Sequence, residues 1–446
     1  MEPLRGDETT VGETTVVARG CRLDDAPVRA VLETDTRPRF FWAAGTESIA
    51  ARGSAATVTA DGQSRFDDVR TAVEALFADS SVPDDLPSVA RPRAFGGFAF
   101  HNGTYEEEDS PWDGFPSAAF FLPEIQVTRR DDDAWLTTVA TGPEAAAEAE
   151  TLLEEWRDRL VADTESEPGA PPGISHRERT PTQDGWREQV AAAIASVDRG
   201  DLQKVVLAQS LSATLDTELS VPDVMARLSE TYPDCYRFML SPDADEGTFF
   251  GATPERLVSV RGRTVRTEAL AGSTGRGDTP AEDEWLAAEL LDSEKDRHEQ
   301  KLVADAIRDQ LEPFASTVRI GDRTVRRLAT VQHLRTSITA ELDGDEHVLS
   351  LVEALHPTPA VGGLPPDAAL RTIRETEAFD RGWYAAPIGW VDAAGNGTFA
   401  VGIRSAVATE REATLFAGAG IVADSDPDRE WDEVQLKYRP ILDELE

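Results

Sequence analysis

The sequence predicts an α+β fold in which large sheets are covered by helices on their outer faces. Two observations lead to this prediction. Short apolar runs separated by turns dominate the first third of the chain, and they are typical of strands. Longer segments with helical patterning follow them and also close the chain. No internal repeat interrupts this mixture over the 446 residues.

The first part of the chain contains three short runs rich in aromatic and small apolar residues. They predict strands over 40–42, 94–100 and 118–122. A helix is expected over 144–160. A stretch rich in Pro, Gly and charge then lacks any apolar period and predicts a linker at 163–184.

Beyond that linker, helices and strands alternate. The first helix is expected over 186–199, and Gly200 provides its end signal. The run KVVLA predicts a buried strand from Lys204. Further strands are expected over 248–252 and 256–260 and alternating with turns over 392–421, and helices are expected over 282–311 and 430–444.

Charge and cysteine content exclude several classes of protein. The chain has 44 Lys and Arg against 83 Asp and Glu, a net charge of −39, which disfavours nucleic acid and anionic membranes as partners. No apolar run spans a bilayer, and the N-terminus lacks a secretory signal. The two cysteines exclude a disulfide framework and favour the cytoplasm. The evenly spread acidity indicates a halophilic protein from a cytoplasm with molar salt.

Two residues at strand ends are candidates for proton transfer. Lys204 begins an apolar strand, where burial disfavours its ammonium and creates a possible base. The commoner alternative is a lysine whose ammonium reaches solvent. Glu255 lies in a turn between two apolar runs, where burial raises its pKa and makes a proton donor. Its alternative is an ion pair with Arg256.

Two acidic pairs share a spacing of three residues, which places both members on one helix face. They are Asp296 with Glu299 and Glu430 with Glu433. If two such helices faced each other, they would form an all-oxygen site suited to Mg²⁺. Because about one residue in five is acidic, either pair alone also arises by chance.

Small residues and one arginine complete the candidates. The runs ALAGS (269–273) and GAGIV (418–422) expose backbone amides that could hold a carboxylate, unless they serve only tight packing. Arg404 ends a strand-like run, where it could bind a carboxylate through two hydrogen bonds, although a surface ion pair is commoner.

Eight ordered motifs together resemble the chorismate-utilising enzymes: isochorismate synthase, salicylate synthase and the synthase subunits that make anthranilate and aminodeoxychorismate. The motifs extend densely from residue 204 to residue 437, with fainter similarity at FGGFAF (95–100) and at 112–123. They are KVVLA, FFGATPERL, EALAGS, SEKDRHEQKLV, LHPTPAVGG, VGIRSA, GAGIV and EWDEVQLK.

The resemblance implies an α/β sandwich with two large antiparallel-rich sheets in a single chorismate-binding domain over 1–446. Residues 1–162 would complete the sheets, 163–184 would be a surface linker, and 185–446 would bear the catalytic motifs.

The resemblance also implies roles for individual residues. Lys204 would be the general base and Glu255 the general acid. Glu299 and Glu433 would bind Mg²⁺, and Asp296 and Glu430 would hold its water ligands. The substrate-binding residues would be Ala271, Gly272, Ser273, His333, Tyr384, Arg404, Gly418, Gly420 and Lys437.

Within this family the chain most resembles the isochorismate synthases. Relatives that add ammonia have Gln in place of Lys204, and the aminodeoxychorismate relatives have a nucleophilic Lys in place of Ala271. We therefore expect water addition without a glutaminase subunit. We also expect a monomer that serves menaquinone biosynthesis, with a catecholate siderophore pathway as the alternative. Salicylate synthase and a non-catalytic, partner-binding relative remain alternatives. Departures from the family pattern occur at Gln209, Gln300 and the Tyr-Ala-Ala run at 384–386.

Overall fold

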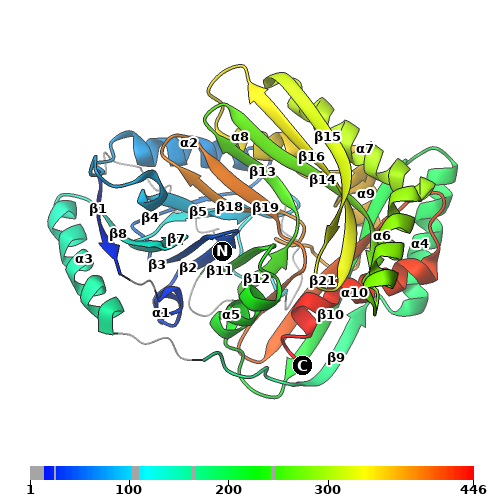
Figure 1. Cartoon of the computed structure of the whole chain (residues 1–446), viewed down its shortest axis with the longest axis horizontal. Helices are drawn as coiled ribbons and strands as arrows, with labels where there is room; N and C mark the ends of the chain where they lie inside the picture. Colours follow the sequence, from blue (N-terminus) through cyan, green and yellow to red (C-terminus); the bar gives the residue numbers. More distant parts are fainter. Residues whose placement is uncertain (1–14, 25–26, 103–109, 163–166, 243–246) are drawn as a thin grey trace, which may run out of the picture.

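The computed structural model describes residues 15–24, 27–102, 110–162, 167–242 and 247–446. Two large sheets form the centre of the molecule, and helices lie outside them (Figure 1). The strand pairs within both sheets are antiparallel. The predicted α+β sandwich with two antiparallel-rich sheets is therefore confirmed.

The first sheet has twelve strands and contains the strand that begins at Lys204. In spatial order its strands are β1 (Val16–Leu23), β8 (Asp133–Thr141), β7 (Ile125–Arg130), β3 (Glu47–Arg52), β2 (Arg39–Ala44), β11 (Tyr236–Ser241), β12 (Thr248–Thr253), β20 (Ser405–Ala408), β21 (Glu412–Ile421), β10 (Lys204–Leu215) and β17 (Gly363–Leu364), with β9 (Ile174–Thr180) also paired to β10.

The second sheet has nine strands and contains the two that carry the ALAGS run and His333. In spatial order its strands are β15 (Ala315–Arg327), β16 (Val331–Leu342), β14 (Thr264–Gly275), β13 (Arg256–Arg261), β19 (Gly397–Val401), β18 (Pro387–Asp392), β5 (Arg93–Phe98), β6 (Ala118–Leu122) and β4 (Ala56–Ala60).

The helices begin at polar caps or prolines, as expected from the hydrogen bonds that a first helical turn leaves open. Ser293 divides the predicted 282–311 helix in two, because it ends one helix and caps the next by accepting from the amide of Asp296. No helix in the described ranges is long and apolar enough to cross a bilayer. The α-helices are α1 (Val28–Leu32), α2 (Arg65–Ala78), α3 (Ala145–Ala162), α4 (Gln183–Asp198), α5 (Val221–Thr231), α6 (Pro280–Asp292), α7 (Glu294–Leu311), α8 (Val348–Leu355), α9 (Pro366–Thr376) and α10 (Pro427–Leu442).

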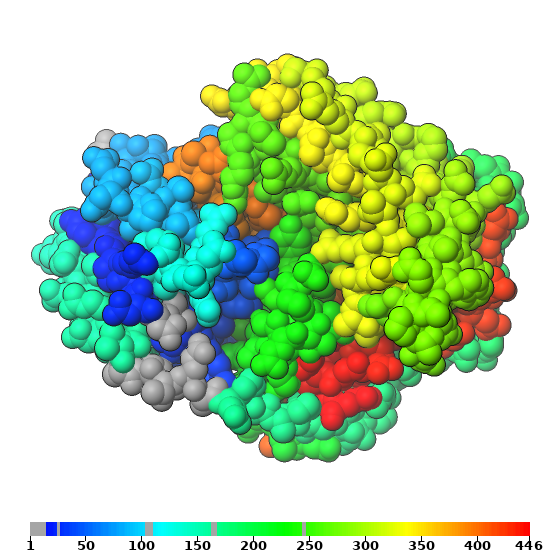
Figure 2. Space-filling view, in the orientation of Figure 1, coloured from blue at the N-terminus to red at the C-terminus, as the bar shows by residue number. Residues whose placement is uncertain are grey.

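Both sheets take strands from each side of the predicted linker. In the first sheet β2 pairs with β11, and in the second β5 pairs with β18. Figure 2 shows the blue and cyan N-terminal segments against the green and yellow later ones on one face. This continuity supports the prediction of one domain, which remains a prediction. Part of the predicted linker is regular, because residues 174–180 form β9 and α4 begins at Gln183.

Aromatic side chains fill the space between the sheets. Phe40 on the first sheet lies 4.9 Å from Phe95 on the second, measured between ring centroids. Trp42 and Trp383 are almost completely buried, as is Trp186 on the outer helix α4. Burial of such large apolar surfaces is the main stabilising contribution to a fold of this size.

One buried ion pair joins helix α9 and its following loop to the first sheet. The side chains of Glu377 and Arg381 are 2% and 1% exposed and lie 2.5 Å apart. Arg381 also donates to the carbonyls of Val206 and Val361, while Glu377 accepts from the amide of Ala208. The pair therefore holds strand β10 against the segment that precedes β17.

We predict that Glu377→Gln lowers the free energy of unfolding by about 3–5 kcal/mol, because it leaves the buried guanidinium of Arg381 without a counter-charge. Urea denaturation followed by tryptophan fluorescence measures the change. Glu375→Gln, an exposed site on α9, is the matched control and should change it by less than about 0.5 kcal/mol. Equal stabilities of the two variants would contradict the prediction.

Candidate active site

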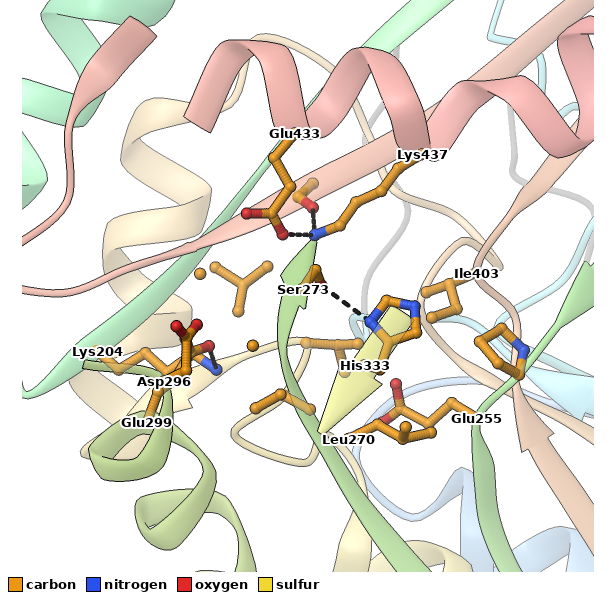
Figure 3. Close-up of a pocket in the computed structure, with 18 of the residues that line it drawn as sticks. Lys204, Glu255, Leu270, Ser273, Asp296, Glu299, His333, Ile403, Glu433 and Lys437 are labelled. Atoms are coloured by element: carbon orange, nitrogen blue, oxygen red, sulfur yellow. Dashed lines mark hydrogen bonds and ion pairs between the residues drawn. The ribbon is translucent and has the colours of Figure 1, made fainter. Parts of the chain in front are cut away.

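Residues of both sheets and of helices α7 and α10 line one pocket, whose empty space is about 790 Å³ including its opening to solvent. Figure 3 shows how its side chains converge. The pocket brings together all the site residues expected from the sequence: Lys204, Glu255, Ala271, Gly272, Ser273, Asp296, Glu299, His333, Tyr384, Arg404, Gly418, Gly420, Glu430, Glu433 and Lys437.

Lys204 is the first residue of β10, and its side chain lines the pocket. Its side chain is 1% exposed, and its Nζ lies 2.8 Å from Oε1 of Glu299. The alternative of a lysine that reaches solvent is therefore wrong. Gly420 on the adjacent strand makes this position possible, since a Cβ there would lie 2.7 Å from Cε of Lys204 and 2.9 Å from Oε1 of Glu299.

Glu255 enters from the opposite side, in the turn between β12 and β13 (Figure 3). The residue is 5% exposed. Burial and the negative charge of Glu268 raise its pKa to about 7, against the opposing charges of Lys204, Arg404 and Lys437. The expected alternative, an ion pair with Arg256, is absent from the described ion pairs, because Arg256 pairs with Glu268. A carboxyl of this kind can hold a proton near neutral pH.

A neutral histidine lies in the wall of the pocket. Nδ1 of His333 is 2.9 Å from Oγ of Ser273, and Nη2 of Arg404 is 3.4 Å from Nε2. Because a guanidinium only donates, Nε2 accepts and Nδ1–H donates to the serine. Burial and the charges of Arg404 and Lys437 hold the pKa of His333 well below its usual value. The imidazole can therefore hydrogen-bond without adding a charge.

Backbone geometry positions several other side chains. Gly272 lies at a bulge between β14 and β16, has a φ of +75° and approaches Asp296 so closely that a Cβ would lie 2.9 Å from Oδ1. Arg404 is also left-handed, with a φ of +51° between β19 and β20. Tyr384 stacks on Phe416, and burial raises the pKa of its phenol to about 12, so the phenol remains neutral.

The four predicted metal-site acids come from α7 and α10, which face each other across the pocket. Three of them are paired with lysines of the pocket. Glu299 pairs with Lys204 at 2.8 Å, Glu430 with Lys295 at 3.1 Å, and Glu433 with Lys437 at 2.6 Å. Asp296 has no ion pair in the described part of the chain.

The pKa shifts of these acids show that negative charge is concentrated between α7 and α10. Burial, with the charges of Glu299 and Glu433, raises the pKa of Asp296. Burial and the charge of Glu433 also raise the pKa of Glu430. The pKa of Glu433 is lowered, because Lys437 and other cations outweigh its burial. The site can therefore accept further positive charge.

The donor set fits Mg²⁺ rather than zinc, because every member is a carboxylate. Within the described ranges, no three His, Cys, Asp or Glu side chains are already grouped for a metal. Mg²⁺ commonly takes one or two protein carboxylates and completes its shell with water and substrate oxygens. Glu299 and Glu433 meet that requirement.

The sequence analysis did not single out seven residues that line the pocket. Lys295 was hidden because its partner Glu430 is 135 residues away. The others are uncharged, so their chemistry did not mark them. All seven nevertheless lie within the motifs that carry the family resemblance, and that position was the signal that could have found them. The seven are Val206, Pro254, Leu270, Lys295, Ala360, Val361 and Ile403.

The chain resembles known proteins over most of its length. Residues 10–446 match the family model described as chorismate binding enzyme. The chain is 37% identical over 431 residues to a salicylate biosynthesis isochorismate synthase of Pseudomonas aeruginosa, covering 95% of this chain and 88% of the relative. It is also 37% identical over 362 residues to the isochorismate synthase MenF of Bacillus subtilis, covering 80% and 75%.

The fold is also similar to that of a solved isochorismate synthase structure. The menaquinone-specific isochorismate synthase MenF of Escherichia coli superimposes with a TM-score of 0.81 at 27% identity. The match covers 97% of this chain and 95% of that one. The similarity therefore includes both sheets and the helices around the pocket.

We predict that the chain binds Mg²⁺ and that Glu433→Gln weakens this affinity at least about tenfold, because it removes one of two facing carboxylates. Isothermal titration with MgCl₂ at constant ionic strength measures the affinity. Glu312→Gln is the control, since that side chain is 63% exposed at the end of α7. Equal affinities of Glu433→Gln and the unsubstituted protein would exclude Glu433 as a ligand.

Proposed function

Since the chain belongs to the chorismate binding enzyme family, we propose that it is an isochorismate synthase that adds water at C2 of chorismate and removes the C4 hydroxyl. One observation carries the proposal. A buried amine, Lys204, and a buried carboxyl with a raised pKa, Glu255, enter one pocket from opposite sides (Figure 3). They are suited to remove a proton on one side of a ring and supply one on the other.

Chorismate is a dianion, and the pocket has cationic and polar groups to receive it. Arg404 is buried beside the neutral His333 and offers a guanidinium to a carboxylate. Lys437 donates to the carbonyl of Gly418 at 2.8 Å, which holds its ammonium at the pocket wall. The walls formed by Leu270, Val361 and Ile403 exclude water around the ring.

The reaction then needs two proton transfers. The amine form of Lys204, reached once its ammonium has released a proton, takes a proton from water, and the water oxygen bonds to C2. The ring double bonds shift, the C4–O bond breaks, and Glu255 gives its proton to the departing hydroxyl. One water enters and one leaves, so chorismate and isochorismate have the same composition. Mg²⁺, when bound by Glu299 and Glu433, would neutralise a substrate carboxylate and polarise the conjugated system.

Two positions support water rather than ammonia or a lysine as the nucleophile. Lys204 supplies a base, which ammonia would not need. Ala271 contributes only a methyl group to the pocket, so no amine at that position can form a covalent adduct with the ring. Both residues favour an isochorismate synthase over the aminating relatives.

Finer assignments belong to the same proposal. We assign the enzyme to menaquinone biosynthesis, supported by the similarity to the two MenF proteins. We also propose a single chorismate-binding domain, activity as a monomer without a glutaminase subunit, and a cytoplasm with high salt as the working environment. The free cysteines and the net charge of −39 support the last assignment.

We predict that the purified chain, incubated with chorismate and MgCl₂ in high salt, forms isochorismate. Lys204→Ala and Glu255→Gln should each lower kcat by about 10²–10⁴-fold, because each removes one proton-transfer group. Chromatography with mass spectrometry measures the product, and circular dichroism checks the fold. Arg187→Ala, at an exposed ion pair, is the control and should retain full activity.

Other outcomes of this assay identify other functions. A product that has lost pyruvate would show a salicylate synthase. No turnover under any salt condition would favour a non-catalytic relative. A requirement for an added glutaminase and glutamine would favour the aminating enzymes. Near-full activity of either substituted enzyme would exclude that residue from proton transfer.

The pKa of Glu255 predicts a pH dependence. Because only the protonated carboxyl can donate, kcat/KM should fall as the pH rises through about 7. A pH–rate profile at constant ionic strength measures this limb. The limb should be absent from the residual activity of Glu255→Gln, and its persistence there would assign it to another group.

A further inference from the structure

A second buried glutamate lies behind the proposed acid and outside the pocket lining. Glu268 is on β14, two residues before Leu270, so both side chains are on the same face of the sheet and only Leu270 reaches the pocket. The side chain of Glu268 is 1% exposed. A carboxylate so deeply buried requires strong compensation.

Three arginines from three different strands compensate Glu268. Oε2 of the glutamate lies 2.5 Å from Nε of Arg335 on β16 and 3.7 Å from Nη2 of Arg256 on β13. Oε1 lies 3.2 Å from Nη1 of Arg326 on β15. Both oxygens of Glu268 therefore have guanidinium partners inside the fold.

The same network fixes the backbone on both sides of Glu255. Nη1 of Arg326 donates to the carbonyl of Pro254 at 2.7 Å. The amide of Arg256 donates to Oε1 of Glu268 at 3.4 Å. The residues immediately before and after the acid are therefore tied to a single carboxylate and its partners.

The charge of Glu268 also acts on the acid. Among the main charge contributions at Glu255, that of Glu268 raises its pKa, whereas those of Lys204, Arg404 and Lys437 lower it. The three cations face the pocket, and Glu268 lies outside its lining. Glu268 is therefore the charged neighbour that favours the protonated acid against the pull of the pocket cations.

We propose that Glu268 is a positioning residue for Glu255, because its arginine-bound carboxylate clamps the backbone around the acid and maintains a fixed negative charge behind it. The proposal rests on the proposed function, since it gives Glu255 the role of proton donor. In this role Glu268 does not touch the substrate, and it affects the reaction only through Glu255.

The test compares Glu268→Gln with the unsubstituted enzyme. The substitution keeps the size of the side chain and removes its charge. The alkaline limb of kcat/KM should move to lower pH by about one pH unit, so kcat/KM should fall about fivefold at pH 7 and approach a tenfold loss at higher pH. The affinity for Mg²⁺ should not change, because among the described residues no side-chain hydrogen bond or ion pair joins Glu268 or its three arginines to α7 or α10.

Two further variants separate charge from geometry. Glu268→Asp keeps the charge but shortens the clamp, so it should lower kcat and leave the alkaline limb in place. If Glu268→Gln does not fold, Glu268→Gln combined with Arg335→Met removes both partners of one buried pair and should show the same shift. Glu47→Gln, at a buried pair with Arg93, is the matched control and should leave the profile unchanged.

A readout without turnover distinguishes this inference from the proposed function. Difference infrared titration against matched Glu255→Gln proteins measures the protonation of Glu255 directly. Lack of turnover by the unsubstituted chain would refute the function, and the infrared titration would still test Glu268. The inference is overturned if Glu268→Gln, or its double variant, titrates Glu255 at the same pH as the unsubstituted protein.

Discussion

The structure depends on one electrostatic constraint: charges removed from water in its central pocket must have partners. Four cationic side chains and five carboxyl groups line the space. Three lysine–glutamate pairs balance most of them. Glu255 meets the constraint in another way, because its raised pKa lets it hold a proton instead of a counter-charge. The chemistry of the pocket follows from which groups are paired and which is protonated.

The two sheets meet this constraint through their register. β10 is paired along ten residues of β21, which places Lys204 beside Gly420, where no side chain obstructs the ammonium. The bulge at Gly272 similarly makes room for Asp296. In the Tyr-Ala-Ala run at 384–386, Ala385 has a φ of +61°. The loop thus keeps a left-handed conformation that an alanine adopts only at some cost.

Sequence patterns predicted elements whose apolar residues repeat regularly, such as the buried strand from Lys204 and the helices α3 and α10. They missed β15, because charged residues lie on both of its faces and none of its residues is buried. They also took residues 174–180 as linker, because β9 is an exposed strand with few apolar residues. Each strand owes its conformation to the ladder with its neighbour rather than to its own pattern.

The sequence by itself determined the kinds of groups available: a lysine at a strand start, a glutamate in an apolar turn, and two acidic pairs at helical spacing. Ordered motifs then sufficed to indicate the family. Only the tertiary structure decided which charges meet. Lys295 pairs with Glu430, and Glu268 pairs with arginines from three strands. These partners lie too far apart in the sequence for any local periodicity to predict the pairs. The reason is physical, since spacing along a chain constrains neighbours within one element, whereas burial and pairing depend on how elements far apart in sequence pack together.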